Sequence, residues 1–255
     1  MGVLSGQHAV ITGGSRGIGA AIATALVEDG ATVSLIGRDA ARLQSTATRL
    51  GPSAYSVVAD VSDRASLAAA FQKARVAHGP ISIVVNNAGI APTAPFHRTD
   101  DALWTSVLAT NLNGTYYGCQ LALEDMRALG FGRIVNVASI AGLKGYAYCT
   151  AYCTAKHAVV GLTRALAIEL ARTSITVNAV CPGFTDTDIV RDAATVLSDK
   201  TGRSADEAVG MLIAGNPQGR LVTPAEVADS VRWLCRPSSG AINGQTITIA
   251  GGEHA

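Results

Sequence analysis

The chain has 255 residues, of which 48% are hydrophobic and 15% charged, so much of it must be buried and intrinsic disorder is excluded. Its 20 basic and 19 acidic residues leave a net charge of +1, without the basic tract that a nucleic-acid partner would require. Every apolar run is broken by charge or glycine before it reaches membrane-spanning length, and the amino terminus lacks the pattern of a signal peptide.

Short β-branched runs alternate with amphipathic Ala- and Leu-rich segments along the whole chain. Apolar strands that alternate with helices indicate βαβ units, in which a parallel sheet is covered on both faces. Right-handed crossovers then give an α/β fold with a doubly wound, Rossmann-type sheet of about seven strands. In chain order we expect strands at 8–12, 32–37, 55–60, 81–87, 132–139, 175–182 and 245–251, and helices at 18–29, 40–50, 64–78, 102–129, 152–171 and 224–235.

No shift in composition divides the chain, so residues 1–255 are expected to form a single domain. The segment at about 184–216 is longer than a normal strand-to-helix connection and mixes Asp, Thr, Ala and Met. Long insertions of this kind usually act as lids or mobile loops. Because the segment follows a strand, it should leave the carboxyl edge of the sheet, where such folds bind ligands.

The cysteine and histidine patterns bear on location and metal binding. The five cysteines are odd in number and include no Cys-x-x-Cys pair, which predicts free thiols in a reducing, cytoplasmic compartment. The five histidines are scattered without metal-ligand spacing, so no metal site is expected.

A glycine-rich turn, "TGGSRGIG", joins the first expected strand to the first helix. Gly13, Gly17 and Gly19 have the spacing G-x-x-x-G-x-G, a variant of the dinucleotide-binding turn, and no Gly-Lys-Ser/Thr follows to make a P-loop. Glycine permits unusual φ angles and close approach of a pyrophosphate, while the helix amino end offers free N–H groups and partial positive charge. The turn therefore predicts a dinucleotide site, although a ligand-free glycine turn would have the same spacing.

The end of the second strand indicates which dinucleotide is preferred. A carboxylate there would bind the adenosine ribose and favour NAD, but this chain has Gly37 followed by Arg38, and Asp39 is better placed as a helix N-cap. Arg38, helped by Arg16, could pair with a 2′-phosphate, which favours NADP(H). If Arg38 only stacks on adenine, NAD(H) serves equally well and remains the alternative.

Tyr152 and Lys156 stand one helical turn apart in "AYCTAK" and so share a helix face. A lysine ammonium beside a phenol is expected to lower the phenol pKa and to make it a proton donor or acceptor near neutral pH. The pair could also be a polar edge on a buried helix, because Tyr-x-x-x-Lys occurs often by chance.

Taken with "TGGSRGIG", "NNAG" and Ser139, in this order and spacing, the pair makes the chain resemble the short-chain dehydrogenase/reductase family over nearly its whole length. The branch it is similar to includes β-ketoacyl and polyketide ketoreductases and secondary-alcohol dehydrogenases. The resemblance implies a catalytic tetrad and a cofactor site. The tetrad would be Asn111, Ser139, Tyr152 and Lys156, and the cofactor contacts Gly13, Ser15, Arg16, Gly17, Ile18, Gly19, Arg38, Asp60, Val61, Asn87, Tyr152, Lys156, Thr185 and Thr187.

The same resemblance implies hydride transfer between a nicotinamide cofactor and a carbonyl carbon, which interconverts a ketone and a secondary alcohol. Tyr152 would transfer the proton, Ser139 would donate a hydrogen bond to the substrate oxygen, and Lys156 would favour the phenolate. The expected substrate is a small hydrophobic or aromatic ketone or a 3-oxoacyl thioester, with Tyr148 in the pocket wall.

Three alternatives stay open: a catabolic NAD-dependent secondary-alcohol or hydroxyacyl dehydrogenase, a non-catalytic nucleotide-binding regulator, and an epimerase or dehydratase. The regulator would be expected to have a broken tetrad, and the epimerases of this family usually have longer chains. A homo-oligomer, a tetramer by family resemblance, is expected to form through the Ala-rich faces of 102–129 and 152–171.

Overall fold

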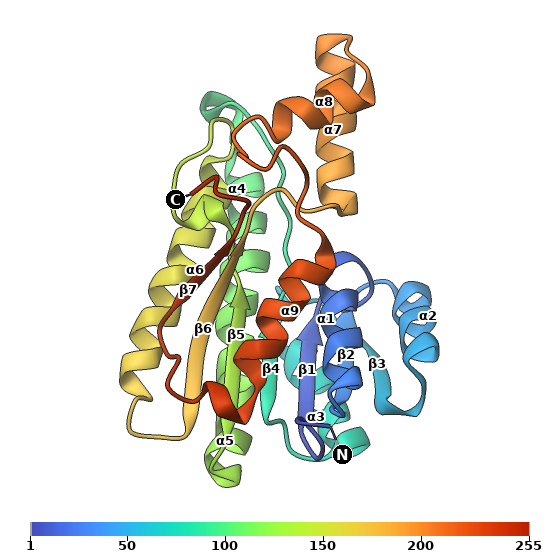
Figure 1. Ribbon diagram of the computed structural model, residues 1–255, viewed down its shortest axis with the longest axis vertical. Coiled ribbons are helices and arrows are strands. Elements are labelled where there is room, and N and C mark those ends of the chain that lie inside the picture. Colours follow the sequence, from blue (N-terminus) through green and yellow to red (C-terminus); the bar gives the residue numbers. More distant parts are fainter. Residues whose placement is uncertain (1, 255) are drawn as a thin grey trace.

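The computed structural model describes residues 2–254 and has one sheet of seven parallel strands in the order β3-β2-β1-β4-β5-β6-β7 (Figure 1). The order reverses at β1, where the chain crosses from one half of the sheet to the other. The expected α/β, doubly wound Rossmann-type fold is confirmed. The strands are β1 His8–Thr12, β2 Thr32–Gly37, β3 Ala54–Val58, β4 Ile83–Asn86, β5 Gly132–Val137, β6 Ile175–Pro182 and β7 Thr246–Ile249.

Nine α-helices accompany the sheet within residues 2–254. The segment expected as one helix at 102–129 is instead two helices separated by a π-helical stretch, Ala109–Asn113. The helices are α1 Gly17–Glu28, α2 Ala40–Leu50, α3 Arg64–His78, α4 Asp101–Leu108, α5 Gly114–Leu129, α6 Thr150–Glu169, α7 Asp188–Thr201, α8 Ala205–Leu212 and α9 Pro224–Cys235.

Alternate strand residues build two cores, one on each face of the sheet. Ile11, Leu35 and Val85 pack with α1, α2 and α9 on one face. Val10 and Val84 point the other way and pack with α3, α5 and α6. Because both faces are covered, the central strands are apolar at every position, which is why they lack the alternation of a half-exposed strand.

The segment expected to be a lid, at about 184–216, contains α7 and α8. These helices project beyond the carboxyl edge of the sheet, at the top of Figure 1. The second of them begins with a capping box, in which the Ser204 hydroxyl accepts from Glu207 N–H and the Glu207 carboxylate accepts from Ser204 N–H. The Ser-x-x-Glu pattern is visible in the sequence and predicts a helix start there.

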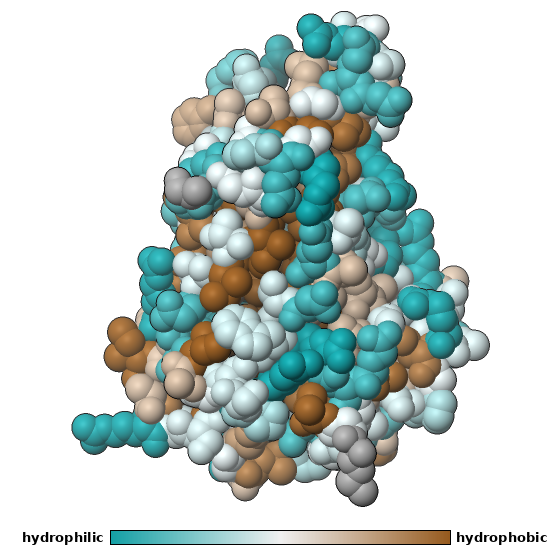
Figure 2. All heavy atoms as spheres, in the orientation of Figure 1, coloured by the Kyte–Doolittle hydropathy of each residue, from teal (hydrophilic) through white to brown (hydrophobic). Residues whose placement is uncertain are grey.

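Apolar surface gathers over the middle of the face seen in Figure 1, around β6 and β7 (Figure 2). The edge strand β7 leaves Ile247 and Ile249 only partly buried, and Trp233 of the neighbouring α9 is 44% exposed. None of the helices in the described chain has the length and apolar character needed to cross a membrane.

Candidate active site

A cavity of about 360 Å³ opens at the carboxyl edge of the sheet, along the ends of β1 to β6. It brings together most of the residues singled out in the sequence. The predicted residues that line it are Gly13, Ser15, Arg16, Gly17, Ile18, Arg38, Asp60, Val61, Asn87, Ser139, Tyr152, Lys156, Thr185 and Thr187. Gly19 and Asn111 are buried directly behind the lining.

The glycine turn is held open by its neighbours. Gly13 has a φ of +67°, and a Cβ there would lie 2.8 Å from Asn87 Nδ2. The Asn87 side chain donates to the carbonyls of Thr12 (3.0 Å) and Gly13 (3.2 Å), so its amide hydrogens fix the turn. The amino end of α1 has no side-chain cap, which leaves its first N–H groups available. A surface without side chains beside uncapped N–H groups fits a pyrophosphate, and the site therefore fits a dinucleotide.

The adenosine end of the cavity is basic. Gly37 ends β2, and Asp39 caps α2 by accepting from Arg42 N–H at 3.0 Å, as the sequence predicts. Arg38 is exposed and forms no ion pair within residues 2–254. Burial raises the pKa of Asp60, but hydrogen bonds from Ser62 and the charge of Arg38 leave it below its usual value, so this carboxylate is ionised.

Arg42 also lines this end of the cavity, and the sequence analysis missed it. Arg38 lies between β2 and α2 and Arg42 lies in the first turn of α2, so the signal in the sequence was a second arginine four residues after the first. The three arginines that line the cavity, where an adenosine phosphate would lie, are therefore Arg16, Arg38 and Arg42.

The Tyr152 phenol is held in a buried environment next to Ser139. Burial raises the pKa of Tyr152 to about 12, and a hydrogen bond from the Ser139 side chain lowers it by less. For the protein groups alone, desolvation of the phenolate outweighs the other contributions, so the expected lowering of this pKa by Lys156 stays a prediction for the site with its cofactor bound. Tyr152 is protonated at neutral pH.

Lys156 is nearly fully buried, and burial lowers its pKa to about 8. Its Nζ donates to Val137 O at 2.7 Å and lies 5.6 Å from the centre of the Tyr152 ring. The ammonium is thus fixed by a strand-end carbonyl on the same side of the cavity as the phenol.

Ser139 follows the end of β5 by two residues and caps a short 3₁₀ turn, Ile140–Gly142. Its Oγ accepts from Ala141 N–H at 3.1 Å, so the hydroxyl hydrogen can be donated either to the Tyr152 oxygen or to a substrate oxygen. Capping of this turn and donation to a substrate oxygen are therefore compatible roles for Ser139.

Asn111 lies in the π-helical stretch and is fully buried. Its side-chain amide donates to Val107 O (2.9 Å) and Ile90 O (3.0 Å), and its Oδ1 accepts from Ile90 N–H (3.3 Å). These bonds fix the loop after β4 against the helix. A Cβ on Gly89 would lie 2.7 Å from Asn111 Oδ1, so glycine is needed where this loop passes between Asn111 and Lys156.

Thr185 and Thr187 begin the segment that leads into α7. Thr185 is buried and donates to Gly183 O at 3.0 Å, and Thr187 donates to Thr185 O at 3.2 Å. The Thr187 methyl group would lie 3.1 Å from a Cβ on Gly17, so the lid segment starts in close contact with the glycine turn. No cluster of three metal-ligating side chains occurs in the described part of the chain.

Comparison with known proteins agrees with this geometry. The family model for short chain dehydrogenases matches residues 7–196. A protein of Streptomyces coelicolor named as a ketoacyl reductase is 37% identical over 99% of this chain and 98% of its own length. The acetoacetyl-CoA reductase of Rhizobium meliloti is 39% identical over 96% of this chain and 98% of its own length. A crystal structure of a point variant of actinorhodin polyketide ketoreductase with NADPH has a TM-score of 0.93 and 36% identity, and covers 99% of both chains.

The chain belongs to the short-chain dehydrogenase/reductase family. It is an oxidoreductase that interconverts a ketone and a secondary alcohol by hydride transfer with a nicotinamide cofactor.

Proposed function

We propose that this enzyme is an NADPH-dependent ketoreductase in which Tyr152 gives the proton to the carbonyl oxygen. The observation that carries the proposal is the Tyr152 phenol, which lies beside Ser139 and Lys156 in the same cavity as the glycine turn. A reductase needs its acid protonated before the reaction, and a pKa of about 12 meets that condition at neutral pH.

Each polar group has a distinct task. The nicotinamide, when bound, supplies the hydride. Ser139 donates its hydroxyl hydrogen to the substrate oxygen and stabilises the charge that develops there. The Lys156 ammonium, held by Val137 O, favours the phenolate as the proton leaves Tyr152. Asn111 positions the Gly89–Ile90 loop rather than the proton itself.

The preference for NADP(H) over NAD(H) is supported by the residues at the end of β2. Gly37 replaces the carboxylate that would bind the ribose hydroxyls, and Arg38 stands next to it without an ion pair within residues 2–254. Arg16 and Arg42 line the same cavity and add positive charge. NAD(H) remains the alternative if Arg38 only stacks on the base.

A hydrophobic or aromatic ketone, or a 3-oxoacyl thioester, is the proposed substrate class. Ile90, Ile189 and Val190 give the cavity apolar walls, and the last two come from the start of α7. Tyr148, expected in the wall, is 63% exposed and is not among the residues that line the cavity. We propose that α7 and α8 act as the lid of a single-domain enzyme, and that the enzyme is cytoplasmic and a homotetramer.

The first experiment is a titration of the purified protein with NADPH and with NADH, followed by nicotinamide fluorescence, and then turnover with acetoacetyl-CoA and with an aromatic diketone. Tighter binding of NADPH together with turnover of either ketone supports the proposal. Preference for NADH would favour the catabolic dehydrogenase, and cofactor binding without turnover of either ketone would favour a non-catalytic regulator. Light scattering of the same sample tests the tetramer.

A further inference from the structure

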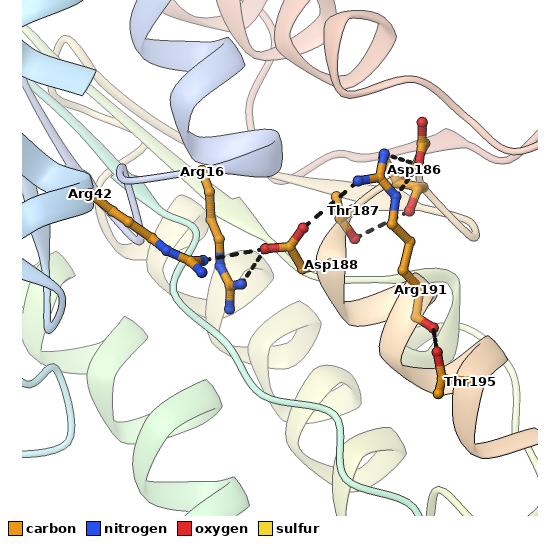
Figure 3. A network of polar contacts seen from close by, with 8 residues as sticks. Arg16, Arg42, Asp186, Thr187, Asp188, Arg191 and Thr195 are labelled. Carbon is orange, nitrogen blue, oxygen red and sulfur yellow. Dashed lines mark hydrogen bonds and ion pairs between the residues drawn. The ribbon is translucent and has the colours of Figure 1, made fainter. Parts of the chain in front are cut away.

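Asp188 is the first residue of α7, and its carboxylate reaches across the mouth of the cavity to two arginines (Figure 3). Its Oδ2 pairs with Arg16 of the glycine turn and, at 3.4 Å, with Nη1 of Arg42 on α2. These partners lie 172 and 146 residues away in the sequence. The arginine charges hold the pKa of Asp188 below its usual value, so the carboxylate is ionised at neutral pH.

The same two arginines line the cofactor cavity beside Arg38 and Asp60. A 2′-phosphate in this region would be recognised by guanidinium groups through charge-assisted hydrogen bonds, as carboxylates are. Asp188 therefore occupies donors that the phosphate would use. A phosphate carries about two negative charges against one for the carboxylate, so it competes successfully for the arginines.

We propose that Asp188 is a specificity-determining residue that couples the lid to the choice of cofactor. The 2′-phosphate of NADP(H) binds Arg16 and Arg42 in place of Asp188 and so releases the start of α7. NAD(H) lacks the 2′-phosphate and leaves these ion pairs in place. The inference rests on the proposed 2′-phosphate site at Arg16. Thr187 contacts the glycine turn directly, so release of its neighbour Asp188 loosens the lid at the entrance of the cavity.

The neighbouring acidic residues do not have this arrangement. Asp186 pairs with Arg191 at 2.9 Å, within the lid segment itself (Figure 3). Asp192, one turn after Asp188, forms no ion pair in the described chain. Among these three carboxylates, only Asp188 joins the lid to the glycine turn and to α2.

The test is the dissociation constant of NADPH and of NADH for the Asp188→Asn enzyme, measured at low salt. Arg16, Arg42 and Asp188 are each 39–52% exposed in their side chains, so each ion pair is weak and the effect is modest. We expect NADPH to bind about three- to tenfold more tightly and NADH to change less than about twofold. Asp192→Asn is the matched control, because it removes the same charge from the same helix, and it should leave the ratio of the two constants unchanged.

Equal changes in the two dissociation constants would overturn the inference, because Asp188 would then hold the lid in the same way with either cofactor. Weaker NADPH binding would also overturn it, because the carboxylate would then assist the phosphate. Hydrogen exchange of residues 188–201 gives a second readout. In the wild-type enzyme NADPH should leave the start of α7 exchanging faster than NADH does, and equal exchange with the two cofactors would refute the coupling.

The two proposals fail separately. If the wild-type enzyme prefers NADH, the proposed NADPH dependence falls, but a shift towards NADPH in Asp188→Asn still supports the role of Asp188. If the wild-type enzyme prefers NADPH and Asp188→Asn leaves the ratio unchanged, the proposed function stands and this inference falls.

Discussion

Replacement of Lys156 by Met should abolish turnover and yet stabilise the protein. Burial lowers the pKa of Lys156 from 10.5 to about 8 in the folded state. The folded protein therefore binds this proton less tightly than the unfolded chain does. Burial of the Lys156 ammonium therefore lowers the free energy of unfolding. This destabilisation is present in full below pH 8, where Lys156 is protonated in both states, and it disappears as the pH rises from 8 to 10.5. The gap between the two pKa values corresponds to about 3 kcal/mol.

Met keeps most of the volume of lysine and removes the buried charge. It also removes the hydrogen bond from Nζ to Val137 O, a loss of about 1 kcal/mol. The net gain at pH 7 is then about 2 kcal/mol, or about 4–8 °C in Tm for a chain of this length. Turnover should be lost because the Lys156 ammonium lies 5.6 Å from the centre of the Tyr152 ring and favours the phenolate, and Met carries no charge to replace it.

The assay is thermal and urea unfolding of the cofactor-free proteins at pH 7, with turnover measured in parallel. Lys73→Met is the control. Lys73 is exposed on α3 and has no ion pair in the described residues, so the free energy of unfolding of this variant should differ from that of the wild type by less than about 0.5 kcal/mol. As a second check, the gain from Lys156→Met should shrink as the pH rises from 8 towards 10.5. A Lys156→Met protein that is less stable than wild type would refute the argument that burial of the Lys156 ammonium destabilises the folded protein.

Three further changes test the site and the sheet. Tyr152→Phe should lower kcat by about a thousandfold while the Kd of NADPH stays within about twofold, and turnover near the wild-type rate would exclude the phenol as the acid. Gly19→Ala would place a Cβ 2.6 Å from Asn87 Nδ2, so cofactor affinity should fall at least about tenfold; unchanged affinity in a fluorescence titration would contradict the packing of the turn. Burial lowers the pKa of His8 from 6.5 to about 4, so the folded state disfavours its charged form, and the stability that depends on neutral His8 is lost as the pH falls from 6.5 towards 4. Urea unfolding should show a loss of about 2 kcal/mol between pH 7.5 and pH 5 that is absent in His8→Gln, and equal pH dependence of the two proteins would show that His8 is not responsible.

Local sequence signals were sufficient for most of the helices and strands. The helices at 40–50 and 64–78 have an Asp N-cap and are followed by a glycine, and the helix at 224–235 has a Thr-Pro start with Glu226 completing a capping box; the structure has these same bounds. The helix expected at 102–129 was less well predicted, because a π-helical stretch keeps the same apolar pattern on either side of it.

The residues of the candidate site also differ in whether the sequence could predict them. Motifs that are continuous in the chain, such as the glycine turn and Tyr152 with Lys156, could be found in the sequence because their residues are close together in it. The ion pairs of Asp188 could not, because they join residues from three elements that only the fold brings together. Arg42 was missed for a related reason: its role depends on which face of α2 meets the cavity.

The largest difference concerns the pKa of Tyr152, and it bears on the direction of the reaction. The i,i+4 spacing predicted a charge effect, but the spacing carries no information about burial, and burial dominates both groups: it raises the Tyr152 pKa to about 12 and lowers the Lys156 pKa to about 8. A phenol that stays protonated across the neutral range is ready to donate, whereas removal of a proton from an alcohol would first require ionisation of the phenol against this desolvation. Ser139 and Lys156 can offset that cost only as the proton leaves, when charge appears on the phenol oxygen. Because the same phenol serves both directions, the prediction concerns pH: oxidation of the alcohol, which needs the phenolate, should gain more from raising the pH than reduction of the ketone does.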